Sequence, residues 1–266
     1  STKTLMILDM PALTGPQMQI VALDESGDRC IDIEGSPRSA KSWGVGFLIW
    51  KLALKYPGIQ IFYARYQEQG LIQLRDVWSK VSVHFPPYLH PQWNSKDECY
   101  DFPGGKWIGE VYTGSRVFLS PIKSTEMDAV HSKYKGKTLA VVVIEEANEV
   151  PRVNYQGLKE RLSQSRTPDG EPCPYPLMSI LVHNCVDEDH WIAKEFPLAA
   201  DGETCTVEGH RHLRADLYSN AGNLGEAVME GYERDYPIGH TLRRTVIEGK
   251  RGVTLIGTPV YGNTFK

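Results

Sequence analysis

Apolar runs of strand length alternate with amphipathic segments from the N-terminal region to about residue 185. The clearest run is 139–144 (Leu-Ala-Val-Val-Val-Ile), whose continuous pattern is typical of a strand buried on both faces of a parallel sheet. Shorter runs predict further strands at 29–34, 60–64, 111–113, 116–120 and 178–182. Apolar residues at helical spacing predict helices at 18–23, 67–81 and 155–164, and a longer helix from Ser42 that ends at Tyr56-Pro-Gly58.

Strands that alternate with helices predict an α/β fold with a mostly parallel central sheet and right-handed crossovers. Residues 84–107 interrupt the pattern because they are rich in proline, aromatic and polar residues, and we interpret them as a loop. From residue 186 onwards, acidic clusters and short helical patterns replace the long apolar strands. The sequence therefore predicts a core at 1–185 and a smaller, partly helical lid or linker subdomain at 186–255.

Composition narrows the class of protein only a little. With 41% apolar and 23% charged residues the chain has the balance of a soluble globular protein, and no apolar run is long enough to span a membrane. The N-terminus lacks the basic region and long apolar core of a secretory signal. A net charge of −4 argues against an evenly basic nucleic-acid-binding protein but leaves room for a local basic patch. The five cysteines lack CxxC spacing, so we expect free thiols in a reducing cytosol.

Residues 35–42 (Gly-Ser-Pro-Arg-Ser-Ala-Lys-Ser) lie between a predicted strand and a predicted helix. They match the phosphate-binding Walker A pattern G-x-x-x-x-G-K-[ST], except that Ala40 replaces the second glycine. In such a loop, backbone N–H groups face the phosphates, Lys41 contributes a positive charge, and Ser42 offers a hydroxyl to Mg²⁺. The sequence therefore predicts a site for ATP and Mg²⁺; the alternative is an ordinary turn.

Glu145 and Glu146 directly follow the apolar run 139–144, at the strand edge where ligands bind in parallel sheets. This is a Walker B arrangement, in which Glu145 holds Mg²⁺ and Glu146 polarises the attacking water. An acidic helix start after a strand is the alternative interpretation. Because both motifs occur in the expected order and context, the sequence favours ATP hydrolysis.

Other polar groups leave alternatives open. Asn184, after the strand predicted at 178–182, either contacts the γ-phosphate or the attacking water or simply ends the strand. Two sets of possible zinc ligands lack the paired spacing of a zinc site: His183, Cys185 and His190, and Cys205, His210 and His212. The aromatic residues between 88 and 112 either stack on bases or cover a core edge. The densest basic group either meets DNA phosphates or is solvated: Arg243, Arg244, Lys250 and Arg251.

Taken in order, the motifs resemble the large terminase subunit of tailed bacteriophages, the motor that packages viral DNA. Arg38 gives the loop at 35–42 its likeness to that family's Gly-Gly-x-Arg-Ser-Gly-Lys-Ser. Gln17 lies where the family has an adenine-reading glutamine. The other similar segments are Lys135-Gly136 ahead of 143–147 (Val-Ile-Glu-Glu-Ala), Asn184 with His190-Trp191, 248–250 (Glu-Gly-Lys) and 257–261 (Gly-Thr-Pro-Val-Tyr). The resemblance covers residues 15–262.

This resemblance implies a P-loop NTPase of the ASCE type, in which a mostly parallel sheet flanked by helices has an extra strand between the two Walker strands and carries a lid. The implied activity is ATP hydrolysis that drives double-stranded viral DNA into a procapsid. The implied catalytic residues are Lys41, Arg38 and Glu146, and the implied Mg²⁺ ligands are Ser42 and Glu145. The implied nucleotide contacts are Gln17, Gly35, Ser36, Pro37, Arg38, Ser39, Ala40, Lys41, Ser42 and Asn184.

The resemblance also implies partners and a location. These are a portal protein, a small terminase subunit and a ring of identical subunits, in the host cell cytoplasm and without a membrane. The family has a nuclease domain after the ATPase region, so 256–266 are expected to begin the linker to it, and this chain is not expected to cut DNA.

The sequence departs from the family at four positions: Ala40 for glycine, Lys135 for a common arginine, Glu145 for aspartate and Cys185 for proline. The change at Lys135 leaves the arginine that acts on a neighbouring subunit open, with Arg152, Arg161 and Arg166 as alternatives.

Two other functions fit the same motifs. One is a helicase or recombination-type ATPase that acts on single-stranded DNA. The other is a nucleotide-binding module whose imperfect loop no longer supports hydrolysis.

Overall fold

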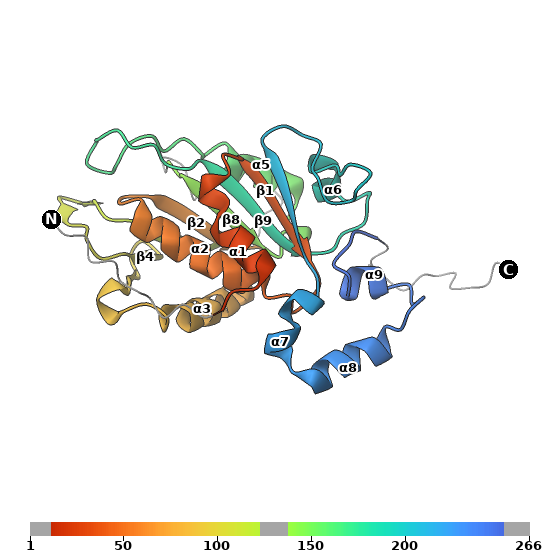
Figure 1. Ribbon diagram of the computed structural model, residues 1–266. Coiled ribbons are helices and arrows are strands. Elements are labelled where there is room, and N and C mark those ends of the chain that lie inside the picture. Colours follow the sequence, from red (N-terminus) through yellow and green to blue (C-terminus); the bar gives the residue numbers. More distant parts are fainter. Residues whose placement is uncertain (1–11, 123–137, 253–266) are drawn as a thin grey trace.

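The computed structural model describes residues 12–122 and 138–252. Their central element is an 8-stranded sheet in the order β10-β1-β9-β8-β2-β7-β4-β3 (Figure 1). Strands β10 to β7 in this order run parallel, and β4 and β3 are antiparallel additions at one edge. The sheet strands are β1 (Cys30–Gly35), β2 (Gln60–Arg65), β3 (Gln92–Asn94), β4 (Cys99–Asp101), β7 (Arg116–Pro121), β8 (Val141–Glu145), β9 (Met178–Asn184) and β10 (His210–Ala215).

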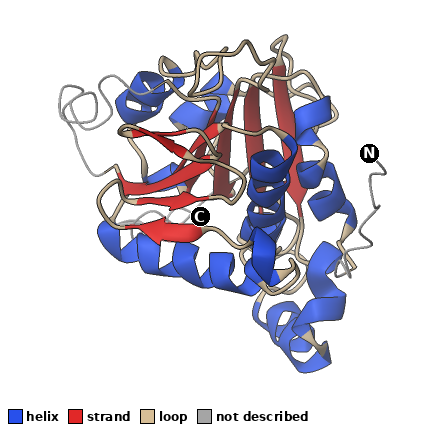
Figure 2. Cartoon of the chain, turned by 90° about the vertical axis from the view of Figure 1, so that its left-hand side faces the viewer, coloured by secondary structure: helices blue, strands red, loops and turns tan. Residues whose placement is uncertain are grey.

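The parallel strands lie in the interior of the molecule, with helices packed outside them (Figure 2). The helices are α1 (Gly15–Val21), α2 (Lys41–Lys55), α3 (Glu68–Ser82), α5 (Arg152–Lys159), α6 (Trp191–Glu195), α7 (Ala221–Leu224), α8 (Glu226–Asp235) and α9 (Arg243–Val246). Apolar residues of α1, α2 and α3 pack on one face of the sheet, and those of α5 and α6 pack on the other. Short 3-10 turns occupy Leu23–Glu25, Pro87–Leu89, Ala147–Glu149 and Tyr218–Asn220.

Strand β8 shows why both faces are covered. Val141 and Val143 belong to the core cluster that contains α2, whereas Val142 and Ile144 belong to the cluster that contains α5. Successive side chains of a strand point to opposite faces, so a strand without polar residues requires an apolar layer on each side. The predicted α/β class and mostly parallel sheet are confirmed, and β9 is the extra strand between β1 and β8.

The interpretation of 84–107 as a loop is wrong in part, because β3 and β4 lie within it. Each is only 3 residues long, too short to show an alternating pattern. Side chains join them to the rest of the fold: Tyr100 stacks on Trp78 of α3 with ring centroids 4.9 Å apart, and Arg116 Nε donates to Asp101 at 2.8 Å. Some aromatic residues between 88 and 112 therefore cover an edge of the hydrophobic core, which was the alternative to stacking on bases.

Two other boundaries differ from the prediction. The strand expected at 111–113 is β6 (Val111–Tyr112), which pairs with β5 (Trp107–Ile108) in a separate 2-stranded hairpin outside the main sheet. The helix expected at 155–164 is α5, which ends earlier because the chain turns to meet β8: Leu139 N–H donates to Arg161 O at 2.9 Å. Gln164 is buried instead and accepts a bond from Gln60 N–H at 2.8 Å.

The segment predicted as a lid or linker, 186–255, contains β10, which is the edge strand of the central sheet beside β1. Helices α7 and α8 follow this strand and project from the core in Figure 1. Part of the segment therefore belongs to the core, while the division near residue 185 into two units stays a prediction. The expected linker at 256–266 and the motif at 257–261 lie outside the described residues, as does Lys135-Gly136.

Among the helices of the described chain, none has the length and apolarity needed to cross a membrane. The five cysteines are free thiols, as expected.

Candidate functional site

The carboxyl ends of β1, β8 and β9 meet at one edge of the sheet, where the chain encloses a cavity of about 400 Å³ that we call the loop cavity. It is lined by Pro37, Arg38, Ser39, Ala40, Lys41, Ser42, Trp43, Val77, Lys80, Glu145, Glu146, Val182, His183 and Asn184. The structure thus brings most of the predicted site residues together. Sequence reasoning missed Trp43 at the start of α2, and Val77 and Lys80 on α3.

The loop between β1 and α2 is fixed by backbone contacts to the C-terminal part of the chain. An added Cβ at Gly35 would lie 2.0 Å from the carbonyl oxygen of Ala215, so only glycine permits this approach of β1 to β10. Ser36 N–H donates to the same oxygen at 2.9 Å, and its hydroxyl donates to Ile247 O at 2.9 Å. Although Gly35 and Ser36 are absent from the lining of the loop cavity, they set the position of the loop.

Arg38 and Ala40 have left-handed backbone conformations, with φ of 61° and 59°. Ala40 takes the place of the second Walker A glycine. The left-handed conformation at this position explains why glycine is usual there. Alanine adopts the same turn at a cost of about 1 kcal/mol. The carbonyl of Arg38 accepts a bond from Asn220 at 2.7 Å, while its side chain is exposed at the mouth of the cavity.

Lys41 is buried and its ammonium group is surrounded by loop oxygens. It donates to Ser36 O at 2.9 Å, Gly35 O at 3.0 Å, Ser39 Oγ at 3.2 Å and Asn184 Oδ1 at 3.4 Å. Burial lowers the pKa of Lys41 to about 8, although nearby acidic groups including Glu145 oppose this shift. The loop therefore holds a desolvated cation at the N-terminus of α2, an arrangement suited to a phosphate anion.

Glu145 at the end of β8 is buried and contacts the first turn of α2. Its Oε2 accepts a bond from Ser42 Oγ at 2.9 Å, and its Oε1 accepts one from Tyr63 OH of β2 at 2.8 Å. Burial raises the pKa of Glu145, and these two hydrogen bonds oppose the rise. A carboxylate and a hydroxyl in contact are hard oxygen ligands, so this pair fits Mg²⁺. Their role as ligands stays a prediction.

Glu146 follows in a left-handed conformation with φ of 51° and lines the loop cavity. Its Oε1 accepts a bond from Nη2 of Arg65 at 2.7 Å. Arg65 is the last residue of β2. It could not be predicted as a site residue, because nothing in the sequence indicates that β2 lies beside β8.

Asn184 and Gln17 have different positions. Asn184 lies in the cavity beside Lys41, and its contact with the γ-phosphate or the attacking water stays a prediction. Gln17 is buried and outside the lining: its Oε1 accepts from Thr14 N–H at 2.9 Å, and its Nε2 donates to Ala40 O at 3.3 Å. Gln17 thus joins α1 to the loop, and its contact with adenine stays a prediction.

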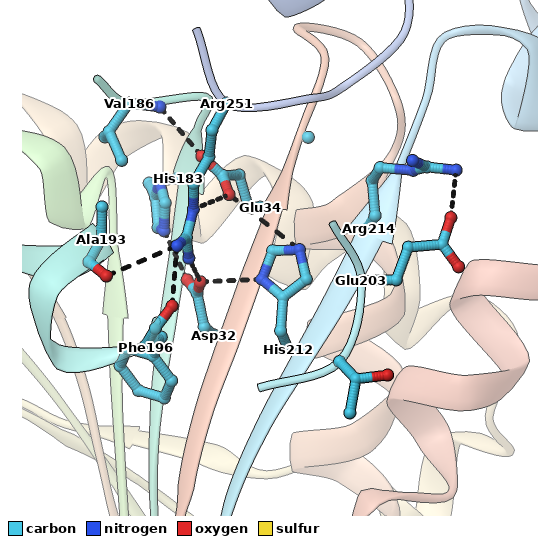
Figure 3. Close-up of polar contacts among 12 residues, drawn as sticks. Asp32, Glu34, His183, Val186, Ala193, Phe196, Glu203, His212, Arg214 and Arg251 are labelled. Atoms are coloured by element: carbon cyan, nitrogen blue, oxygen red, sulfur yellow. Dashed lines mark hydrogen bonds and ion pairs between the residues drawn. The ribbon is translucent and has the colours of Figure 1, made fainter. Parts of the chain in front are cut away.

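Charged side chains form a buried network below the loop (Figure 3). Asp32 and Glu34 of β1 both bond to Arg251, at 2.8 Å each. Asp32 also contacts His183 of β9 at 2.5 Å and His212 of β10 at 2.9 Å. Burial alone raises the pKa of Asp32, but the two histidines hold it well below its usual range.

The structure bears on two of the open alternatives, the possible zinc ligands and the basic group. Within the described residues, the His, Cys and carboxylate groups close enough to share a metal are Asp32, Glu34 and His212. Neither possible zinc set therefore comes together, although His212 belongs to one of them. Arg251 already forms ion pairs with both carboxylates of that group. The basic group at 243–251 is also largely engaged: Arg251 is buried, Arg243 pairs with Glu233 at 2.7 Å, and Lys250 pairs with Glu248 at 3.4 Å. Contact of this group with DNA phosphates stays an alternative.

Comparison with known proteins shows the fold. No family model and no curated protein matches the chain. The large terminase of a thermophilic bacteriophage aligns with a TM-score of 0.66 and 15% identity over 91% of this chain and 54% of its own length. That terminase has also been solved in complex with ADP and with ATP-γ-S.

Two further terminases align as well. The ATPase domain of the Thermus phage P74-26 large terminase gives a TM-score of 0.58 and 14% identity over 91% of this chain and 94% of that domain. The HK97 bacteriophage large terminase gives 0.59 and 8% over 91% of this chain and 51% of its own. The chain thus spans about half the length of the thermophilic-phage and HK97 proteins and has the fold of terminase ATPase domains, which confirms the predicted resemblance and fold class.

Replacing Ala40 with glycine should stabilise the protein. Glycine removes the steric cost of the left-handed conformation, and we expect the free energy of unfolding to rise by up to about 1 kcal/mol. Chemical denaturation measures this difference. The control is Ala53→Gly in the right-handed interior of α2, which should lower stability by about 1 kcal/mol or more. Equal losses in the two variants would contradict the strain at Ala40.

Removing Arg251 should be far more costly than removing an exposed arginine. Arg251→Met leaves Asp32 and Glu34 without this cation, and we expect a loss of about 3–5 kcal/mol in the free energy of unfolding. Arg211→Met breaks the half-exposed pair with Asp28 and should cost about 0–1 kcal/mol. Denaturant titration of both variants is the measurement. Similar losses of unfolding free energy in the two variants would show that the buried network contributes no more to stability than an exposed ion pair.

Proposed function

We propose that the chain is an ATP-hydrolysing motor domain that drives the translocation of double-stranded viral DNA. The observation that carries the proposal is the meeting of Lys41, Ser42, Glu145 and Glu146 around one cavity at the carboxyl edge of the sheet. Each group has the chemistry that phosphoryl transfer to water requires. The likeness to terminase ATPase domains supplies the second part of the proposal, the link to DNA.

The proposed mechanism assigns one task to each group. Lys41, Arg38 and the N–H groups at the start of α2 bind the phosphates and stabilise the charge that develops on them. Glu146 accepts a proton from the attacking water, and Asn184 contacts the γ-phosphate or that water. Ser42 and Glu145 hold Mg²⁺, which neutralises phosphate charge when bound.

The proposed biological setting follows the terminases that share the fold. The substrate is duplex DNA, and the partners are a portal protein, a small terminase subunit and further copies of this chain in a ring. The work takes place in the host cell cytoplasm. DNA cleavage is not assigned to these residues.

Changes in the phosphate-binding loop and at the carboxylate after β8 should impair ATP hydrolysis in different ways. Lys41→Ala should remove ATP binding, whereas Glu146→Gln should bind ATP and hydrolyse it at least about 100-fold more slowly. The control is Glu149→Gln, an exposed carboxylate outside the cavity lining. Phosphate release and nucleotide binding are measured over a range of protein concentrations, because ring motors complete their sites between subunits. A Glu146→Gln protein as active as its parent would sink the proposal.

The DNA substrate separates the main proposal from its alternatives. We expect duplex DNA to stimulate ATP hydrolysis more than single-stranded DNA of the same length, because the motor is proposed to act on the double helix. The measurement is the rate of phosphate release with each DNA at matched salt. Stronger stimulation by single strands would favour a helicase or recombination-type ATPase. Saturable ATP binding with no phosphate release, also with partners added, would indicate a module that only binds nucleotide.

A further inference from the structure

We propose that Asn220 is a positioning residue that holds Arg38 in its left-handed conformation and thereby keeps the side chain of Arg38 at the mouth of the loop cavity. This inference rests on the proposed ATPase function, because Arg38 is one of the groups proposed to bind phosphate. It gives a residue of the C-terminal segment, outside both Walker motifs, a role in nucleotide binding and turnover.

Asn220 is a buried polar residue that the proposed mechanism does not use. It ends the 3-10 turn Tyr218–Asn220 and is 5% exposed. Its Nδ2 donates to the carbonyl oxygen of Arg38 at 2.7 Å, although the two residues are 182 positions apart. Because a buried amide without a partner is costly, this contact is a specific one. Asn220 is absent from the lining of the loop cavity, so it acts on the loop and not on a ligand.

Arg38 has a backbone conformation that residues with a Cβ seldom adopt. Its φ of 61° is in the left-handed region, where Cβ lies too close to the following carbonyl oxygen. Rotation of the peptide group that joins Arg38 to Ser39 would relieve this strain. Because that group is planar, its carbonyl oxygen would move with it and leave Asn220. The hydrogen bond from Asn220 therefore opposes the rotation and holds Arg38 in this conformation.

The conformation matters because the backbone directs the side chain of Arg38. Its guanidinium pairs with no acidic side chain among the described residues and is exposed at the mouth of the loop cavity. The direction of a side chain follows from the backbone conformation of its residue. Rotation of the backbone would therefore swing the guanidinium away from the place where it is proposed to contact phosphate. A displacement of about 1 Å is enough to lower a rate about 100-fold.

Contacts within the C-terminal segment fix Asn220 itself. Its Oδ1 accepts a bond from Asn223 Nδ2 at 2.9 Å, which orients the amide so that its own Nδ2 faces Arg38. Its N–H donates to Leu217 O at 3.1 Å, and Leu217 N–H donates to Ile247 O at 2.9 Å. Helices α7 and α8 follow Asn220 directly. A displacement of these helices is thereby transmitted to Arg38.

ATP hydrolysis and ATP binding by the full chain test the inference. Asn220→Leu, which has a similar shape but no donor, should lower kcat/KM roughly three- to thirtyfold. The decisive measurement is a double-mutant cycle with Arg38→Ala, followed in both kcat/KM and the Kd of ATP. Because Asn220 is proposed to act through Arg38, Asn220→Leu should change either constant by less than about twofold once Arg38→Ala is present.

The control is Gln164→Leu, which removes another buried amide that donates to a backbone carbonyl, Gly58 O at 2.8 Å. Gln164 is absent from the lining of the loop cavity. This variant should lower the free energy of unfolding, as Asn220→Leu does, and keep the parental kcat/KM. A loss of stability alone is thereby separated from a loss of position at Arg38.

Two outcomes overturn the inference and leave the proposed function intact: parental kcat/KM in Asn220→Leu, or an equal loss with and without Arg38. If Asn220→Leu does not fold, Asn223→Ala decides by the same criteria, because it changes an exposed residue and removes the bond that orients the amide of Asn220. A parent protein that binds ATP without hydrolysing it overturns the proposed function, and this inference falls with it.

Discussion

Asp32 and Glu34 place two carboxylates inside the central sheet, on a strand with neighbours on both sides. A buried charge is tolerated only with partners of opposite sign and with hydrogen bonds. Here the partners come from different places in the chain: His183 from β9, His212 from β10 and Arg251 from the segment after α9. The ion pairs and hydrogen bonds of these carboxylates therefore link β1 to both neighbouring strands and to the C-terminal part of the described chain. Strand β1 leads into the loop at 35–42, so the same ion pairs fix the base of the candidate site.

In the loop cavity, polar contacts also join neighbouring elements. Lys41 lies among loop oxygens, Glu145 between Ser42 and Tyr63, and Glu146 against Arg65. Residues of β2 thus contact both carboxylates at the carboxyl end of β8. Together these contacts orient the groups that the proposed hydrolysis requires before any ligand binds. Such prior orientation is a main source of electrostatic catalysis.

The motifs could be predicted from the sequence because their chemistry is local. A glycine loop between a strand and a helix, and two carboxylates after an apolar run, each occupy a few consecutive residues, and the structure brings Lys41, Ser42 and Glu145 together as expected. Arg65 and Tyr63 were missed because their importance arises from the adjacency of β2 and β8, which periodicity does not encode. Arg251 was grouped with exposed basic residues for the same reason, since its buried partners are more than 200 positions away. Strands β3 and β4 were too short to produce a pattern.

The hydrogen bonds from Ser36 to Ala215 and Ile247 bear on how the domain is divided. Both Walker motifs lie ahead of residue 185, yet the loop at 35–42 and the buried carboxylates of β1 take partners from residues 212–251. A unit that keeps these partners therefore has to extend past residue 185, at least to Arg251. A fragment cut after β9 would retain every residue proposed for catalysis and lose the interactions that keep them in place.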